Sequence, residues 1–279
     1  MKQNTFAIVG LGLLGGSLGG ALRKAFPKAN IIGVSRSASK VSVARKMGLI
    51  TEGTTKLQAA ARKADVIVIC TPVDTIPKLI SAIDNSAKSG AIVTDVGSTK
   101  GELIRWVERQ KLRNIRFVGS HPMAGSHLTG IEHANPNLYQ SSLVFVARHH
   151  GINKKALNQV VAMWQKLTGK VFMIDANSHD AIAAEISHLP HLIASLLVST
   201  TSQKAMMFAS SGFKDTTRVA QGDPRLWIPI FASNRTCLKH LLKRFRASLF
   251  RLEKILKTQN VHMLGHFLKK ASVRRQKIT

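Results

Sequence analysis

The sequence is poor in cysteine and proline and has little acidic charge. Its 279 residues include two cysteines, Cys70 and Cys237, which cannot build the disulfide framework of a small secreted domain and indicate a reducing compartment. Its 8 prolines are scattered without a period, which excludes collagen-like and proline-rich chains. A hydrophobic fraction of 44% excludes a disordered chain. The sequence therefore predicts a globular protein of one large or two medium domains.

Long apolar runs also appear scarce. Residues 6–22 follow Lys2 and are apolar, but they include six glycines and reach the basic pair Arg23 and Lys24 too soon to span a bilayer comfortably. We expect the rest of the chain to be too interrupted by charge to cross a membrane. These features favour a cytoplasmic protein without a membrane partner.

Acidic residues are few beside basic ones. The chain has 41 Lys and Arg against 14 Asp and Glu, a formal net charge of +27, and residues 236–279 hold twelve basic residues and one acid, Glu253. Such a surplus makes nucleic acid a candidate partner. However, the chain has one tyrosine and no recognisable nucleic-acid-binding motif, and its charges surround the predicted helices. We therefore expect a solvated basic surface and no specific nucleic acid partner.

The first part of the chain alternates short apolar strands with helical patterns. Strands rich in β-branched residues are predicted over residues 5–9, 30–34, 65–70, 91–94, 116–118, 143–146 and 170–174. Helical patterns lie between them, for example over residues 17–24, 56–63, 75–87 and 154–168. Apolar strands joined by helices are typical of a parallel sheet buried on both faces. The predicted fold is α/β, with a Rossmann-type, doubly wound, mostly parallel sheet.

The remaining sequence shows helical patterns over residues 180–202, 229–257 and 261–270 and no clear strand. We therefore predict two domains, a dinucleotide-binding domain over residues 1–175 and an all-helical substrate and dimerisation domain over residues 176–279. The segment 182–199 is apolar on too many sides for a surface helix. We expect it to be buried in the interface of a homodimer.

A glycine-rich turn follows the first predicted strand and precedes a helix. In this G-x-G-x-x-G pattern Gly10 permits a tight turn, Gly12 lets backbone N–H groups approach a pyrophosphate, and Gly15 lets the helix pack against the strand. The phosphate would lie at the N-terminus of the helix. A purely structural glycine turn is the alternative. The expected cofactor-binding residues here and after the strand 65–70 are Gly10, Gly12, Leu13, Leu14, Gly15, Thr71 and Pro72.

The end of the second predicted strand indicates which dinucleotide binds. An NAD site usually has Asp or Glu there to bond the ribose 2′-hydroxyl, but this strand runs into Ser35 and Arg36, with Lys40 close behind. A hydroxyl and a guanidinium suit a 2′-phosphate. We therefore expect Ser35 and Arg36 to bind NADP, with NAD as the alternative cofactor and a merely solvated Arg36 as the alternative for that residue.

Polar clusters recur in loops that can meet at one edge of the sheet. Loops after the carboxyl ends of parallel strands are where doubly wound sheets bind ligands. The clusters are DVGSTK at residues 95–100, HPMAG at 121–125, SHLPH at 187–191, GFKDTTR at 212–218, Trp227, and the pair Asn234 and Arg235.

These motifs, in this order, resemble the prephenate/arogenate dehydrogenase family of tyrosine biosynthesis. The resemblance extends from the glycine turn to at least Arg235, which is most of the chain. It implies a nucleotide-binding domain followed by a helical dimerisation domain. It also implies an enzyme that oxidatively decarboxylates a cyclohexadienyl acid and passes a hydride to NAD or NADP. The expected reaction converts prephenate to 4-hydroxyphenylpyruvate, and conversion of arogenate to tyrosine is the alternative.

The resemblance implies roles for individual residues. His121 would take the proton of the ring hydroxyl as hydride leaves the same carbon, a task that suits a neutral imidazole with a pKa near the operating pH. Ser98 would orient this histidine, the hydroxyl and the nicotinamide. The planar guanidinium of Arg218 would hold a substrate carboxylate. The residues expected to line the substrate pocket are Ser187, His191 and Trp227.

Other residues leave alternatives open. Asp180 and Asp215 match acids that the family places near the arginine or uses as supports, and either is equally suited to capping a helix or forming a salt bridge. Glu185, His188 and His191 have the spacing of one helix face, but Pro190 interrupts it and no further ligand is evident, so we expect no metal. A β-hydroxyacid dehydrogenase is the alternative enzyme, although it would be expected to use a lysine in the helical domain.

The choice of substrate rests on conflicting features. His191 resembles prephenate-using members of the family, and His127 stands where some members have an acid that would face the ammonium of arogenate. The Ser35 and Arg36 pair instead resembles arogenate-using members from photosynthetic organisms. Because the visible contacts are cationic, the sequence favours prephenate.

Overall fold

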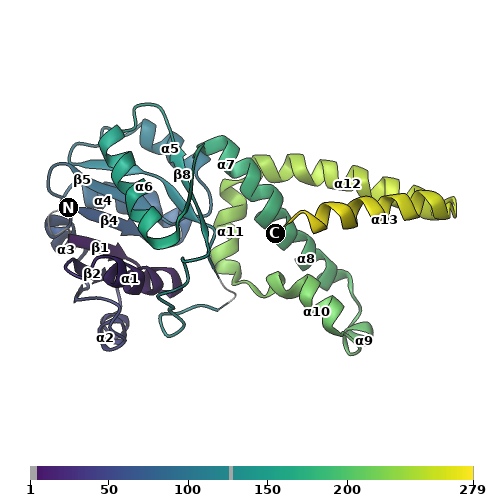
Figure 1. The fold of residues 1–279 in the computed structure, drawn as a ribbon, viewed down its shortest axis with the longest axis horizontal. Helices are drawn as coiled ribbons and strands as arrows, with labels where there is room; N and C mark the ends of the chain where they lie inside the picture. Colours follow the sequence, from purple (N-terminus) through teal and green to yellow (C-terminus); the bar gives the residue numbers. More distant parts are fainter. Residues whose placement is uncertain (1–4, 126–127, 279) are drawn as a thin grey trace. The chain divides into compact units, whose positions relative to one another are not determined.

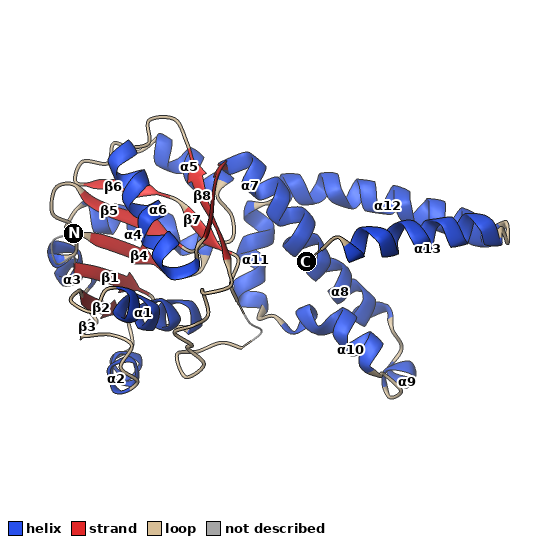
Figure 2. Cartoon of the chain, viewed as in Figure 1, coloured by secondary structure: helices blue, strands red, loops and turns tan. Residues whose placement is uncertain are grey.

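The structure, a computed structural model, describes residues 5–125 and 128–278 and forms two compact units, Met1–Asn234 and Arg235–Thr279. The first unit is built on a six-stranded sheet of order β3-β2-β1-β4-β5-β6, in which all neighbouring strands are parallel (Figure 1, Figure 2). This is the strand order of a dinucleotide-binding doubly wound sheet, with its switch point between β1 and β4. The predicted fold class is confirmed. The strands are β1 Thr5–Val9, β2 Asn30–Val34, β3 Glu52–Thr54, β4 Val66–Ile69, β5 Ala91–Asp95 and β6 Ile115–Val118.

Helices cover both faces of this sheet, and the side chains of β1 alternate between two cores. Phe6 and Ile8 pack in the core that α1 and α6 complete. Ala7 and Val9 pack in the core that α3, α4 and α5 complete. This alternation is the period of two that a strand buried on both faces requires. The helices are α1 Leu13–Ala25, α2 Ala38–Lys46, α3 Leu57–Lys63, η1 Val73–Thr75, α4 Ile76–Asp84, α5 Gly101–Glu108 and α6 Lys154–Thr168.

A second sheet of three strands follows, formed by β7 Ser120–Pro122, β8 Leu143–Arg148 and β9 Lys170–Asp175. β7 is antiparallel to β8 and places His121 opposite Phe145, and β8 is parallel to β9. The sequence analysis does not predict β3 or β7, because each has only three residues and neither is an apolar run. β7 matters for function because it fixes the backbone of His121.

Helices make up the rest of the first unit. They are α7 Ala176–Ala183, the π-turn η2 Ala184–His188, α8 Leu189–Thr200, α9 Gln203–Met206, α10 Ser211–Thr217, η3 Arg218–Gln221 and α11 Pro224–Ser233. α7, η2 and α8 form one continuous helix. The π-turn lies directly before Pro190, which has no N–H to donate to the preceding turn, so the predicted helix continues through the proline with a local widening.

This continuous helix, Ala176–Thr200, is long and apolar enough to cross a membrane by length and composition, with a mean hydropathy of 1.5 and 28% of the tested stretch buried. The expectation that charge interrupts every later apolar run is therefore wrong for this segment. Length and composition are weak evidence for a span, because core helices of soluble proteins meet the same criteria. Three of its polar side chains, His179, Asp180 and His188, are buried within the protein.

The second unit consists of α12 Arg235–Lys257 and α13 Val261–Gln276, which pack against each other (Figure 1). The Asn260 side chain caps α13 by accepting a hydrogen bond of 2.9 Å from Met263 N. The predicted helix 229–257 is thus two helices, because the chain leaves helical geometry at Asn234 between α11 and α12.

Elements on both sides of Asp175 pack together within the first unit. The Asp180 carboxylate of α7 accepts hydrogen bonds from the first backbone N–H groups of α5, and α11 packs against η1. The predicted division into residues 1–175 and 176–279 stays a prediction about domains, while the compact units divide at Asn234.

Candidate active site

The glycine turn has the shape that its sequence predicts. Gly10 has φ +104°, and a Cβ there would lie 2.6 Å from the Cys70 carbonyl oxygen. A Cβ on Gly15 would lie 1.9 Å from the Gly10 carbonyl oxygen, so both glycines are required by packing. A Cβ on Gly12 would meet nothing within 4 Å. Gly12 therefore borders open space at the end of β1, where a pyrophosphate can approach the backbone.

The N-terminus of α1 is suited to an anion. Its cap residue, Gly12, has no side chain to bond the first N–H groups, and the first turn contains no acidic residue. The N–H groups of Leu13 and Leu14 belong to this uncapped turn, where the helix dipole favours negative charge. Thr71, two residues after the end of β4, lies against Gly10, and its hydroxyl is 2.7 Å from that of Thr75. Pro72 follows it and is exposed.

The end of β2 presents the two residues expected to select the dinucleotide. The Ser35 hydroxyl accepts a hydrogen bond of 3.2 Å from Ser37 N, which tightens the turn into α2. The Arg36 guanidinium is exposed and forms no hydrogen bond or ion pair with the described part of the chain. The prediction that this pair binds a 2′-phosphate remains a prediction.

A buried ion pair joins the end of β5 to the residue before α5, and its carboxylate also bonds the start of β7. The Asp95 carboxylate pairs with the Lys100 ammonium, and both side chains are almost fully inaccessible to solvent. The same carboxylate accepts hydrogen bonds from Gly97 N at 2.9 Å and from Ser120 N at 3.1 Å. Ser98 lies between Asp95 and Lys100 in the sequence, and His121 follows Ser120. The Asp95 carboxylate and its partners therefore fix the backbone next to both candidate catalytic residues.

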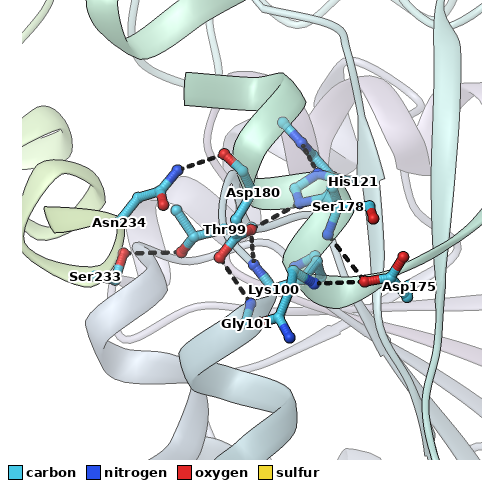
Figure 3. A network of polar contacts seen from close by, with 12 residues as sticks. Thr99, Lys100, Gly101, His121, Asp175, Ser178, Asp180, Ser233 and Asn234 are labelled. Atoms are coloured by element: carbon cyan, nitrogen blue, oxygen red, sulfur yellow. Dashed lines mark hydrogen bonds and ion pairs between the residues drawn. The ribbon is translucent and has the colours of Figure 1, made fainter. Parts of the chain in front are cut away.

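His121 is the end of a chain of three buried side chains. Its Nδ1 lies 2.9 Å from Nε2 of His179, and Nδ1 of His179 lies 2.8 Å from an oxygen of Asp180. That carboxylate also accepts hydrogen bonds from Lys100 N at 2.7 Å and Gly101 N at 2.8 Å, as Figure 3 shows. The carboxylate therefore caps α5 and holds the histidine pair at once.

Burial sets the charge of the histidines near this site. It lowers the pKa of His121 well below its usual value, and the nearby His179, Lys100 and His188 lower this pKa further. Burial also lowers the pKa of His188 to about 4. His121 is therefore a neutral imidazole at neutral pH, as a proton acceptor must be. The expectation of a pKa near the operating pH is wrong, because desolvation disfavours the imidazolium.

A stack of aromatic rings forms a second part of the site. His191 of α8 lies on Trp227 of α11, with ring centroids 3.8 Å apart and an angle of 28° between the planes. Phe231 packs against Trp227 at 5.4 Å. Nδ1 of His191 is buried and has no hydrogen-bond partner in the described residues. The structure thus brings together two of the predicted substrate-pocket residues, and leaves a buried polar atom available to a ligand.

In the described residues, no hydrogen bond or ion pair joins the other predicted site residues to these groups. Ser98 is half-buried in the loop between β5 and α5, and no hydrogen bond between its hydroxyl and His121 is present in the described residues. Ser187 is half-buried in η2, and Arg218 is exposed at the start of η3, which packs along α8. His127 lies outside the described residues.

His179 is a site residue that the motifs do not predict. Its partners are His121, 58 positions earlier, and the carboxylate of the next residue. The adjacency of a histidine and an acid after the last strand was the available signal. In the described ranges, no three His, Cys, Asp or Glu side chains are grouped to hold a metal ion.

Comparisons with known proteins agree with this organisation. The family model described as prephenate dehydrogenase, nucleotide-binding domain, matches residues 18–173, and that described as prephenate dehydrogenase, dimerization domain, matches residues 175–270. A prephenate dehydrogenase from Bacillus subtilis is 30% identical over 260 residues, which are 91% of this chain and 69% of the relative.

Solved structures of similar enzymes superpose on the whole chain. A prephenate dehydrogenase from Aquifex aeolicus, in complex with hydroxyphenyl propionate and NAD+, has a TM-score of 0.93 and 30% identity, covering 100% of this chain and 99% of the other. An arogenate dehydrogenase from Synechocystis has a TM-score of 0.84 and 29% identity, covering 99% of this chain and 100% of the other.

Proposed function

We propose that this chain, which belongs to the prephenate dehydrogenase family, converts prephenate to 4-hydroxyphenylpyruvate and CO₂ in tyrosine biosynthesis, with hydride transfer to a nicotinamide cofactor. The observation that carries the proposal is His121, a buried neutral base held beside the carboxyl end of β5. The glycine turn lies at the same edge of the sheet and fits a dinucleotide, since Gly12 borders open space before an uncapped helix. The Aquifex relative was solved with NAD+ and a ligand that has a hydroxyphenyl ring.

The chemistry asks little of the protein beyond positioning and proton transfer. When bound, the nicotinamide accepts the hydride from the carbon that bears the ring hydroxyl. Nε2 of His121 takes the hydroxyl proton as the hydride leaves. The electron pair of the bond to CO₂ then enters the ring, which becomes aromatic, and the ring oxygen takes a proton back to give the phenol. The protein has to align these groups, and the carboxylates of the dianionic substrate call for cations such as Arg218.

Two variants test these roles. His121→Asn should lower kcat about 10²–10⁴-fold with little change in cofactor affinity, because the base is needed only as the transition state forms. Arg218→Ala should raise KM first, because it binds a carboxylate in ground and transition states alike. His133→Asn, which changes an exposed histidine, is the control. If both site variants matched this control, the site would lie elsewhere.

The preferred cofactor is NADP in this proposal. The exposed Arg36 has no competing partner in the described residues, and no carboxylate ends β2, so the position suits a 2′-phosphate. The test compares kcat/KM for NADP and NAD in wild type and Arg36→Ala. The variant should lose much more with NADP than with NAD, whereas Arg45→Ala, an exposed cation on α2, should affect the two equally. Equal losses in Arg36→Ala would contradict the assignment.

The preferred substrate is prephenate, with arogenate as the alternative. The groups that the structure gathers near His121 and the His191 stack are imidazoles and a buried cation, and the acids among them, Asp95 and Asp180, are already engaged by N–H groups. The ammonium group of arogenate would need a free carboxylate as its partner, whereas prephenate has no ammonium group and needs none. Steady-state rates with both substrates decide. A kcat/KM ten times higher for arogenate would reverse this choice and leave the mechanism intact.

The proposed assembly is a cytoplasmic homodimer with no specific nucleic acid or membrane partner. The helix Ala176–Thr200 exposes Ile182, Ile186, Leu196 and Leu197, a set of large apolar side chains that a partner subunit would cover. Light scattering at micromolar concentration should give the mass of a dimer, and a monomer would contradict the proposal. DNA binding that weakens steeply with salt would contradict the absence of a nucleic acid partner.

A further inference from the structure

We propose that His179 and Asp180 are positioning residues that fix the tautomer of His121, so that Nε2 of His121 carries the lone pair that accepts the substrate proton. This inference rests on the proposed function, in which His121 is the base. It assigns a role to two residues outside the motifs that carry the resemblance to the family.

The direction of the hydrogen bonds follows from the carboxylate. An ionised carboxylate can only accept, so the proton between it and His179 belongs to Nδ1 of His179, at 2.8 Å. We propose that His179 is neutral, so that its one N–H is on Nδ1 and its Nε2 is left as an acceptor. Nδ1 of His121 lies 2.9 Å from that acceptor and must hold the proton between them. Nε2 of His121 is therefore the free acceptor.

The carboxylate is itself held in one orientation. Its two oxygens accept the first two N–H groups of α5, from Lys100 and Gly101, and the positive end of the helix dipole favours its charge. The backbone carbonyl of Asp180 accepts a hydrogen bond of 2.7 Å from the Asn234 side chain. The carboxylate of Asp180 therefore cannot turn away from His179 without leaving the N–H groups of Lys100 and Gly101 unpaired.

His179 is equally restrained. It is fully buried, and the Phe145 ring packs edge-on against it at 5.4 Å with an angle of 80° between the planes. His121 meets it at 75°, so the two imidazoles are joined by one nitrogen from each ring. His179 therefore has little room to turn its ring away from His121 and Asp180.

The same chain also meets the charge that appears on His121 during the reaction, a charge that burial and the neighbouring cations otherwise disfavour. The groups that face His121 are His179, His188 and Lys100, and the Lys100 charge is paired with Asp95. When His121 takes a proton, its Nδ1–H bond to neutral His179 becomes charge-assisted and stronger. The negative charge of Asp180 lies one imidazole further away. The effect on rate should therefore be smaller than where a carboxylate bonds the catalytic histidine directly.

Two replacements of His179 form a matched pair. The amide of Gln reaches the position of Nε2 and can accept from His121, whereas the amide of Asn reaches only the position of Nδ1 and can bond Asp180 alone. His179→Asn should lower kcat by about 10- to 1000-fold, below the roughly 10⁴-fold cost of a wrong tautomer in a serine-protease triad. His179→Gln should stay within about tenfold of wild type, and KM for the cofactor should not change in either variant. Equal losses in the two variants would overturn the proposal.

A measurement on the resting protein separates this inference from the proposed function. Long-range ¹H–¹⁵N spectra of protein labelled with ¹⁵N-histidine report which ring nitrogen is protonated, and the His121 signals are those lost in His121→Asn. Wild type should show His121 protonated at Nδ1 alone, and His179→Asn should show both tautomers. His150→Gln, an exposed histidine, is the control. If His121 of the wild-type protein were protonated at Nε2, the tautomer proposal would be overturned, even if neither His179 variant folds. If the wild-type protein were inactive on both substrates, only the proposed function would be refuted.

Discussion

Replacing Lys100 by Met tests how the protein holds its candidate catalytic residues. The side chain of Lys100 is 1% exposed and that of its partner Asp95 is fully buried. Met fills nearly the same volume, so the change removes the charge with little loss of packing. The Asp95 carboxylate keeps its bonds from Gly97 N and Ser120 N but loses its counter-charge. Breaking a buried pair in this way costs about 3–5 kcal/mol, because the remaining charge is uncompensated.

The assay is denaturation by urea at pH 7.5 and one fixed protein concentration, followed by tryptophan fluorescence and circular dichroism. Lys63→Met is the control, because Lys63 pairs with Glu52 at 2.7 Å but both side chains are about half exposed. That exposed pair should contribute no more than about 1 kcal/mol. The double variant Asp95→Asn with Lys100→Met should lose less than the sum of its single variants, since neither partner is left charged and alone. A loss below about 1 kcal/mol in Lys100→Met would refute the reasoning.

Three further predictions follow from the site. Gly15→Ala should lower the free energy of unfolding by roughly 1–3 kcal/mol, since its Cβ would lie 1.9 Å from a carbonyl oxygen. Gly12→Ala should change the free energy of unfolding by no more than about 0.5 kcal/mol and should raise the KM for the cofactor. Lowering the pH from 7 to 4 should reduce the free energy of unfolding by roughly 3 kcal/mol through His188. The reason is that folding lowers the pKa of His188 from 6.5 to about 4, so the unfolded chain binds the proton first. His188→Asn should remove that part of the pH dependence. Trp227→Leu should raise the substrate KM about 2–10-fold without changing the cofactor KM, through loss of the stack on His191.

The sequence predicted those features whose causes are local. The strands 5–9 and 30–34 are apolar runs with clear ends, and the structure has them at the same bounds. The glycine turn was predictable because nearby backbone leaves no room for a side chain at Gly10 or Gly15. Short or polar elements were not. β7 is a strand only because β8 lies beside it, and nothing in Ser-His-Pro indicates this pairing.

The motifs and the family resemblance predict candidate site residues, but they do not predict the contacts between those residues. His121, His191 and Trp227 were identified from motifs, and the stack of the latter two is present. Asp180 was left between a capping and a substrate role, and the structure shows a cap on a helix 80 positions earlier in the chain. Such a bond depends on how two distant segments pack, which composition and periodicity do not encode. His179 was missed for the same reason.

The carboxylate of Asp180 also limits where the chain can be cut. A protein ending at Asp175 would keep every strand of the main sheet but lose the acceptor for the first N–H groups of α5, and Ile230 of α11 would no longer cover the core beneath η1. A protein truncated at Asp175 would therefore lack helical segments that its nucleotide-binding part needs in order to fold. The two family models nevertheless meet at that point. The nucleotide-binding and helical parts were separable as patterns of sequence, yet they are interdependent as folding units.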